Sequence, residues 1–327
     1  MKYLLPIIIT VLLNSSVQAA SNTTQKVINK GITDINEIKI KNKTRKLVIK
    51  KNDINSIRNF TIPDNIRTFF YVDNNTSSIN GLMLNPSLKK LTLFNSAISS
   101  LENISFNENI EQVQIAFNPL ENLDELDFSS VNLKRLFLDN NSIKTLNGLI
   151  LNDNLEEAFF NDNQITTVNN YVFPSSLKTL SLTLNRLSTF NGHLLNSNLE
   201  VLQIGGNDFD NYSDIVNLPS KLKTLILGSL VTPTDFTGLV LPDVLELLSI
   251  GLTSATQEDF RTLTLPPNLK RINFSQNSIT SLDGLEFPSS LRKLDLRGNP
   301  ISKQEKLIIK RRFKKEIPKL KIKFGSF

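Results

Sequence analysis

The 327-residue sequence contains no cysteine, no tryptophan and a single histidine, His193. Without cysteine there can be no disulfides, thiolate metal sites or catalytic cysteines. With one histidine, a histidine-rich metal site is excluded, and a hydrolase triad would have to use His193. The sequence also contains no GxSxG motif, no phosphate-binding P-loop and no GxGxxG motif after a strand. We therefore predict no catalytic residues, no metal ligands and no cofactor; calcium held between acidic loops, such as those with Asp208 and Asp210, is a minor alternative.

Long hydrophobic runs are also scarce, and the longest lies at the start of the sequence. Lys2 precedes an apolar run from Tyr3 to Leu13, and Val17-Gln18-Ala19 matches a small-x-small cleavage site. This pattern predicts a signal peptide over residues 1–20. The run is shorter than the roughly 20 residues that span a bilayer, although a buried or membrane-anchored N-terminal helix is the alternative. We expect a secreted chain, extracellular or periplasmic, without a transmembrane anchor.

The net charge of +6 is unevenly distributed. Residues 20–51 contain nine Lys/Arg and two acidic residues, and residues 303–323 contain ten Lys/Arg and two acidic residues. Between them, residues 52–302 contain 17 Lys/Arg and 27 Asp/Glu, a net charge of −10. An acidic body argues against simple nucleic-acid binding. We interpret the basic ends as solvated surface, with weak contact to an anionic surface as the alternative.

A phrase of about 22 residues recurs along the body of the chain. LKRLFLDNNSIKTLNG at 133–148 is closely similar to the text at 176–192 and at 269–284. A fixed period of this length predicts a solenoid, in which each unit buries its apolar face against its neighbours. Twelve units are present, 22 to 24 residues apart. They start at Thr44, Ile66, Leu88, Ile110, Leu133, Leu155, Leu177, Leu199, Leu222, Leu245, Leu269 and Leu291.

Each unit contains one expected strand. Counted from the unit start, positions +3 and +5 are apolar, as in Leu136 and Leu138, so one face of a short strand points inward. One strand per unit gives a parallel sheet roughly 55 Å long at about 4.8 Å per strand. The return segments carry Gly and Pro, as in GLVLPD at 238–243. These residues favour an extended or turn-rich path over long helices.

The pattern LxxLxLxxNxIxxLxGLxxP, clear from Leu133 to Ile143, resembles the leucine-rich repeat family over residues 44–301. The resemblance implies an α/β solenoid: a right-handed horseshoe of about 12 repeats with a concave parallel β-sheet and a mostly irregular or extended convex side. The chain also resembles secreted bacterial members of the internalin-like and effector-like types. That resemblance implies a virulence-associated role, as an adhesin or a host-interaction factor.

Position +8 is usually asparagine. The resemblance implies that these amides form a structural ladder between units, and an amide can both donate to and accept from buried backbone. Ser96, Leu230 and Thr253 interrupt the pattern, and we expect irregular structure with short helical turns at 222–268. The ladder residues are Asn52, Asn74, Asn118, Asn141, Asn163, Asn185, Asn207, Asn277 and Asn299.

Both ends of the stack need covering. Residues 21–43 are expected to form an N-terminal cap, and residues 302–327 a basic C-terminal cap made of a helix and a strand. Ser302 and Glu305 predict a capping box. It should open a helix of about a dozen residues that ends before Pro318, with the strand at 319–324. Its expected apolar contacts are Leu307, Ile308 and Phe313.

The variable residues between the leucines should face the concave surface. There we predict an apolar strip with acidic neighbours that binds a protein partner, because soluble proteins rarely expose such patches without use. Alternatively, the rings cover one another and stiffen the sheet. A second functional alternative is a module that binds carbohydrate or an anionic polymer through the basic ends. His193 is expected to pack on the return side. The predicted strip comprises Phe70, Phe94, Phe117, Phe137 and Phe159, with Asp73, Asp139, Glu157 and Asp162 beside it.

Overall fold

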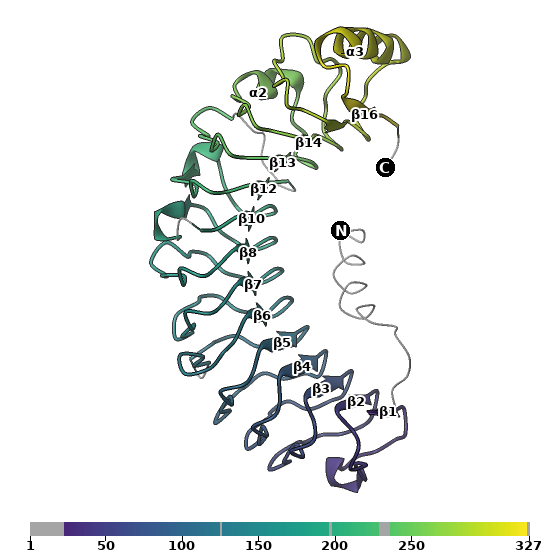
Figure 1. The fold of residues 1–327 in the computed structure, drawn as a ribbon, viewed down its shortest axis with the longest axis vertical. Coiled ribbons are helices and arrows are strands. Elements are labelled where there is room, and N and C mark those ends of the chain that lie inside the picture. The colour runs from purple at the N-terminus through teal and green to yellow at the C-terminus, as the bar shows by residue number, and fades with distance from the viewer. Residues whose placement is uncertain (1–22, 125, 196–197, 229–235, 326–327) are drawn as a thin grey trace.

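A computed structural model describes residues 23–325, apart from 125, 196–197 and 229–235. The predicted signal peptide therefore lies outside the described residues. The chain forms a solenoid in which 14 of the described strands make one parallel sheet in sequence order. Figure 1 shows the turns stacked into an arc, with the sheet along its inner side. The predicted parallel-sheet solenoid of about 12 turns is confirmed.

The strands are short because the chain must turn away from the sheet once in every unit. Those near the N-terminus have five residues and the later ones three. The first five are β1 Thr24–Ile28, β2 Lys46–Lys50, β3 Thr68–Val72, β4 Lys90–Phe94 and β5 Gln112–Ala116. The others are β6 Arg135–Phe137, β7 Glu157–Phe159, β8 Thr179–Ser181, β10 Val201–Gln203, β12 Thr224–Ile226, β13 Leu247–Ser249, β14 Arg271–Asn273, β15 Lys293–Asp295 and β16 Lys321–Lys323.

A single apolar core runs through the stack. Every predicted unit-start residue, from Thr44 to Leu291, is buried, as are the side chains at +3 and +5 such as Leu136 and Leu138. No unit could bury these side chains alone, so each turn is stabilised by its two neighbours. The segment before the first unit joins the sheet as well, because β1 pairs in parallel with β2.

The return side has little regular structure. It contains the 3₁₀ turns η1 Ile35–Glu37, η2 Gly192–Leu194 and η3 Tyr212–Asp214, and a small parallel sheet of β9 Phe190–Asn191 and β11 Ile215–Val216. The helix α2 Gln257–Arg261 lies in the region where helical turns were expected, and Thr256 and Asp259 form its capping box. Among the described residues, none of the helices combines the length and the apolar character that crossing a bilayer requires.

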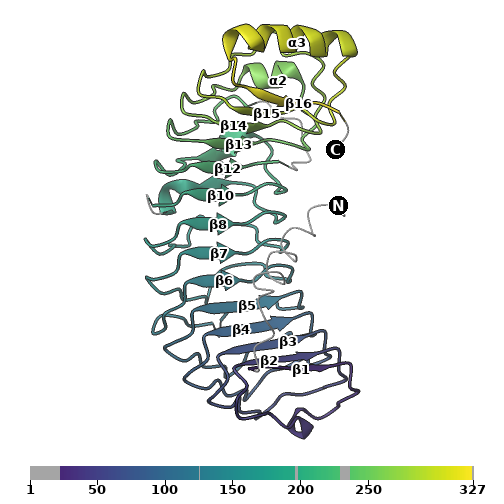
Figure 2. The ribbon, with the colours of Figure 1, turned by 45° about the vertical axis from the view of Figure 1, so that its right-hand side comes forward.

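The C-terminal helix α3 Lys303–Glu316 lies across the last turns of the stack (Figure 2). Ser302 caps it by accepting from the Glu305 amide at 3.0 Å. The Glu305 carboxylate accepts instead from Ser281 Oγ at 2.9 Å, so the predicted capping box is only half formed.

Two of the three predicted apolar contacts of α3 are wrong. Phe313 is buried, but Leu307 and Ile308 are 55% and 49% exposed. Ile309, four residues before Phe313, is buried in their place, because residues four apart share one face of a helix. The Phe313 ring lies 5.3 Å from that of Phe287 in the last units.

Candidate functional site

Among the described residues, each strand of the large sheet from β1 to β15, apart from β12, is followed by a residue in the left-handed backbone region, at position +7 of its unit. Asn, Asp and Gly tolerate this conformation, whereas a bulky side chain there is strained. Phe117 is such a case, with φ of 57°. The resulting left-handed row borders the concave sheet along one edge. It comprises Asn29, Lys51, Asp73, Asn95, Phe117, Asn140, Asp162, Leu184, Gly206, Leu252, Gln276 and Gly298.

The asparagines at +8 bind backbone groups of two successive turns. Asn163 Nδ2 donates to Leu138 O at 2.9 Å in the preceding turn and to Phe160 O at 3.0 Å in its own. Its Oδ1 accepts from the Ile143 amide at 3.2 Å. All nine asparagines donate to a carbonyl of the preceding turn, so they hold the edge of the sheet in register.

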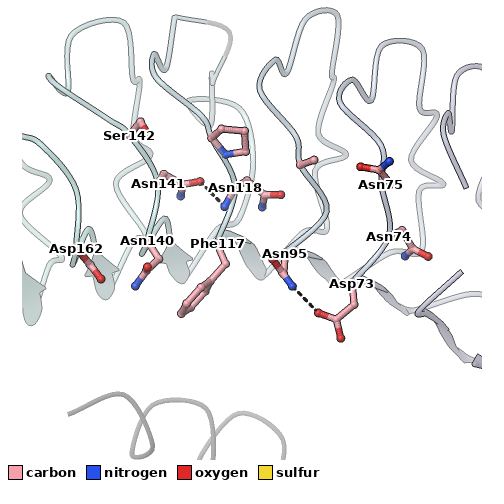
Figure 3. Close-up of a pocket in the computed structure, with 12 residues that line it drawn as sticks. Asp73, Asn74, Asn75, Asn95, Phe117, Asn118, Asn140, Asn141, Ser142 and Asp162 are labelled. Atoms are coloured by element: carbon pink, nitrogen blue, oxygen red, sulfur yellow. Dashed lines mark hydrogen bonds between the residues drawn. The ribbon is translucent and has the colours of Figure 1, made fainter. Parts of the chain in front are cut away.

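A groove of about 630 Å³ runs beside the left-handed row in the N-terminal half of the stack. Figure 3 shows Asp73, Asn95, Phe117, Asn140 and Asp162 pointing to the same side. Asp73 accepts from Asn95 Nδ2 at 2.8 Å, and its other oxygen lies 3.4 Å from Lys50 Nζ. The described residues that line the groove include two carboxylates and several amides, but no lysine or arginine. The groove therefore offers mainly hydrogen-bond acceptors, with one aromatic ring among them.

The five predicted phenylalanines do not form one continuous strip. The strand register places Phe70, Phe137 and Phe159 at +4, with Thr92 and Gln114 between the first two. Phe94 lies at +6 and Phe117 at +7. Alternate residues share a face of a strand but occupy different rows, so a shared face does not imply contact.

The structure instead makes two ring pairs. The Phe94 and Phe117 centroids are 4.8 Å apart, as are those of Phe137 and Phe159, whose rings are nearly parallel. Phe137 is only 7% exposed, while the other three rings are half-buried. Phe70 stands apart and lies 4.7 Å from Lys46 Nζ in a cation–π contact.

Asp139 lies at +6, two residues after Phe137 on the same strand face. It is 7% exposed, and its Oδ1 accepts from the Asn161 backbone amide at 2.9 Å and from Asn161 Nδ2 at 2.7 Å. Burial raises the pKa of Asp139 to about 6, although the bonds from Asn161 oppose the rise. Sequence reasoning missed Asn161; its +6 position, one unit after Asp139, is the signal that could have identified it.

This carboxyl predicts a pH-dependent stability. The pKa of Asp139 is about 6 in the folded chain and 3.8 as the ordinary value, so the protonated carboxyl favours the folded state. This contribution to the free energy of unfolding is complete below about pH 4 and is lost as pH rises through 6. Asp139→Asn keeps an acceptor for Asn161 and removes the charge. We expect the variant to match the parent near pH 4 and to exceed its free energy of unfolding by on the order of 2 kcal/mol at pH 7.5. Urea unfolding across that range measures the difference, and parallel profiles would contradict it.

Glu157, the remaining predicted acidic residue, lies at +2 between Arg135 and Thr179 in the register. Position +1 carries a row that sequence reasoning did not find, with lysine and glutamate alternating from unit to unit; we term it the Lys–Glu row. Neighbouring side chains pair across turns. The pairs are Lys89–Glu111 at 2.6 Å, Lys178–Glu156 at 3.4 Å, Lys223–Glu200 at 3.0 Å and Lys270–Glu246 at 2.7 Å.

His193 is exposed, so the prediction that it packs on the return side is wrong. Asn191 Oδ1 accepts from the His193 amide at 3.0 Å and starts the 3₁₀ turn η2, and Leu195 is the residue buried after it. Among the described residues, no three His, Asp or Glu side chains lie close enough together to hold a metal ion.

The chain is similar to known proteins in its repeats and its fold. Residues 267–308 match the family model for leucine-rich repeats in two copies. An internalin from Listeria monocytogenes superposes with a TM-score of 0.64 and 19% identity, covering 98% of this chain and 93% of that one.

Two further structures share the fold. YopM from Yersinia enterocolitica has a TM-score of 0.58 and 21% identity, covering 93% of this chain; this chain spans 64% of YopM. A leucine-rich repeat protein from Leptospira interrogans has a TM-score of 0.51 and 20% identity, covering 86% of this chain and 78% of that one. No curated protein matches the sequence.

Proposed function

We propose that this leucine-rich repeat protein binds a protein partner on the N-terminal half of its concave face, along the edge that the left-handed row borders, without catalysing a reaction. Solenoids with this fold are typically protein-interaction modules, but a fold does not fix a function, so the proposal rests on the site. The observation that carries it is the presence of two stacked or tilted pairs of rings, Phe94–Phe117 and Phe137–Phe159, beside the acceptor-rich groove.

The rings supply the apolar part of the binding surface. Aromatic side chains are enriched at the energetically dominant positions of protein interfaces. Three of the four rings keep part of their surface accessible. Phe117 is held in the left-handed region, which costs free energy that a purely structural residue such as asparagine would avoid. This strain supports a role for the ring beyond packing.

The groove determines the chemistry of the partner. Asp73, Asp162 and the amides of Asn95 and Asn140 line it. Lys50 lies 3.4 Å from one oxygen of Asp73, whereas Asp162 makes no ion pair among the described residues. A complementary segment would place an apolar side chain against Phe117 and present donors, such as arginine, lysine or backbone amides, to the carboxylates. Rim charges of this kind set the rate of association and the specificity more than the affinity.

The proposal includes export. The sequence of residues 1–20 favours cleavage near Ala19 or Ala20, and the similarity to an internalin and to YopM suggests that the partner is a host protein. Protein recovered outside the producing cell should then begin at Ala20 or Ser21, which N-terminal sequencing would show.

The test is the double substitution Phe117→Ser and Phe159→Ser, which removes one ring from each pair. The purified parent is first used to capture partners from host or envelope extracts. Affinity for a captured protein is then measured by titration. Loss of two central aromatic residues should weaken binding roughly 1,000-fold, because each such residue contributes about 2 kcal/mol and every 1.4 kcal/mol is tenfold.

The matched control is Val172→Ser with Val240→Ser on the return side. These valines are 75% and 78% exposed, so the control also removes two apolar side chains. Circular dichroism and urea unfolding must show that all three proteins fold. If the control loses affinity as strongly as the double variant, or the double variant binds like the parent, the proposed site is wrong.

A further inference from the structure

Beyond partner binding on the concave face, we propose that the outward face of α3 docks on an anionic membrane surface. The inference rests on which side chains of this helix face the stack and which face solvent. It uses a different part of the molecule from the concave site. Figure 2 shows α3 across the end of the arc, with one long side turned away from the repeats.

Acidic residues of α3 are turned toward the stack or already paired. Glu305 is half-buried and accepts from Ser281 Oγ at 2.9 Å. Glu316 is held by Arg312 at 2.9 Å, and the same guanidinium donates to the carbonyls of Leu282 and Leu285. Of the two carboxylates of the helix, Glu316 is paired with a cation and Glu305 is half-buried against Ser281, so neither is aimed at a surface that the outward face would meet.

The opposite face contains four cations. Lys303, Arg311, Lys314 and Lys315 are exposed, and Arg311 is three, four or eight residues from each of the others, which places the four on one side of the helix. None of the four has an ion-pair partner in the part of the chain that the structure describes. Lysine and arginine near an anionic bilayer each contribute about 1 kcal/mol of attraction.

Two apolar side chains lie among these cations. Leu307 and Ile308 are 55% and 49% exposed, although both are in the middle of a helix with a buried face available at Ile309 and Phe313. A polyanion such as RNA or heparin would gain little from them. A bilayer interface accepts apolar side chains below the headgroups while the cations remain among the phosphates, as amphipathic surface helices do. The combination favours a lipid surface over a soluble polymer.

The test is sedimentation of the purified full chain with vesicles of phosphatidylcholine alone or mixed with phosphatidylglycerol. The parent should bind only the mixed vesicles and be released at high salt. Arg311→Gln with Lys314→Gln and Lys315→Gln should weaken partitioning roughly 100-fold. Leu307→Gln with Ile308→Gln should weaken it about tenfold without altering the net charge.

The charge-matched control is Lys89→Gln with Lys134→Gln and Lys178→Gln, which removes three cations from the Lys–Glu row. It should bind vesicles like the parent, as should the Phe117→Ser, Phe159→Ser variant. Equal binding to neutral vesicles, equal loss in the Lys–Glu control, or an apolar variant that binds like the parent would each overturn the proposal. If the basic variant loses heparin binding while the apolar variant binds vesicles normally, the face is a polyanion site instead.

Discussion

Replacing Asn163 by alanine should lower the free energy of unfolding by on the order of 4 kcal/mol. The side chain makes four buried hydrogen bonds, and those to Leu138 O, Phe160 O and the Ile143 amide link two turns. Alanine leaves the Ile143 amide buried without a partner, which costs about 1–3 kcal/mol. The carbonyls of Leu138 and Phe160 each lose one of two bonds, at about 1 kcal/mol each, because Asn141 and Asn185 still donate to them. The midpoint of urea unfolding measures the effect.

Two controls separate the ladder from general surface effects. At Ser96, which occupies the same position, the hydroxyl donates to Phe94 O at 2.9 Å and accepts only a long bond from the Asn74 amide at 3.5 Å, so Ser96→Ala should cost less, about 1–2 kcal/mol. Asn147→Ala changes an exposed asparagine of the return side and should be close to neutral. If Asn163→Ala is as mild as Asn147→Ala, the amides do not hold the turns together.

Gly205→Ala should be comparably damaging for a different reason. A Cβ at Gly205 would overlap the carbonyl oxygen of Gly228 in the next turn, and Gly228 stands in the same relation to Gly251. The backbone of Gly205 and that of Gly228 are both fixed in the sheet edge, so neither can move aside for the Cβ as a flexible side chain could. We expect a loss of about 3 kcal/mol or more in the free energy of unfolding, the upper range for overpacking.

Thr183→Ala is the matched control for that substitution. Thr183 occupies the +6 position one turn before Gly205, so the backbone there accommodates a Cβ. Its hydroxyl is buried and makes no hydrogen bond among the described residues, so its removal should be neutral or slightly stabilising. Thermal unfolding of both variants compares them. If Gly205→Ala lowers the stability only slightly, adjacent turns can move apart at the +6 position.

The sheet and the core could be predicted from the sequence because the same apolar positions recur in every repeat. Each unit places Leu or Ile at the same offsets, and a one-residue slip would expose all of them. Twelve consistent copies leave no competing register, which is why residues such as Leu136 and Leu138 were identified correctly. The positions of the asparagines relative to the strands followed from the same spacing.

Side-chain rows and helix faces could not be predicted with the same precision. The L-x-L pattern shows that Phe94 and Phe137 face outward, but only strand register separates their rows. At Phe117, a left-handed backbone turns the side chain to a new direction, which no apolar pattern reveals. In α3, Leu307, Ile308 and Ile309 are consecutive, so the sequence does not show which face of the helix is buried. The contact between Phe313 and Phe287 decides it.

Because of the Lys–Glu row, the loss of an odd number of units has a different effect on the stack from the loss of an even number. Lysine and glutamate alternate from Lys89 to Lys270, so loss of one unit, such as residues 155–176, would bring Lys134 beside Lys178. Loss of two units, residues 155–198, would bring Lys134 beside Glu200 and restore attraction. Each exposed pair is worth only up to about 1 kcal/mol, so the alternation is a bias, not a barrier. Shortening or lengthening of this solenoid is therefore favoured in steps of two units.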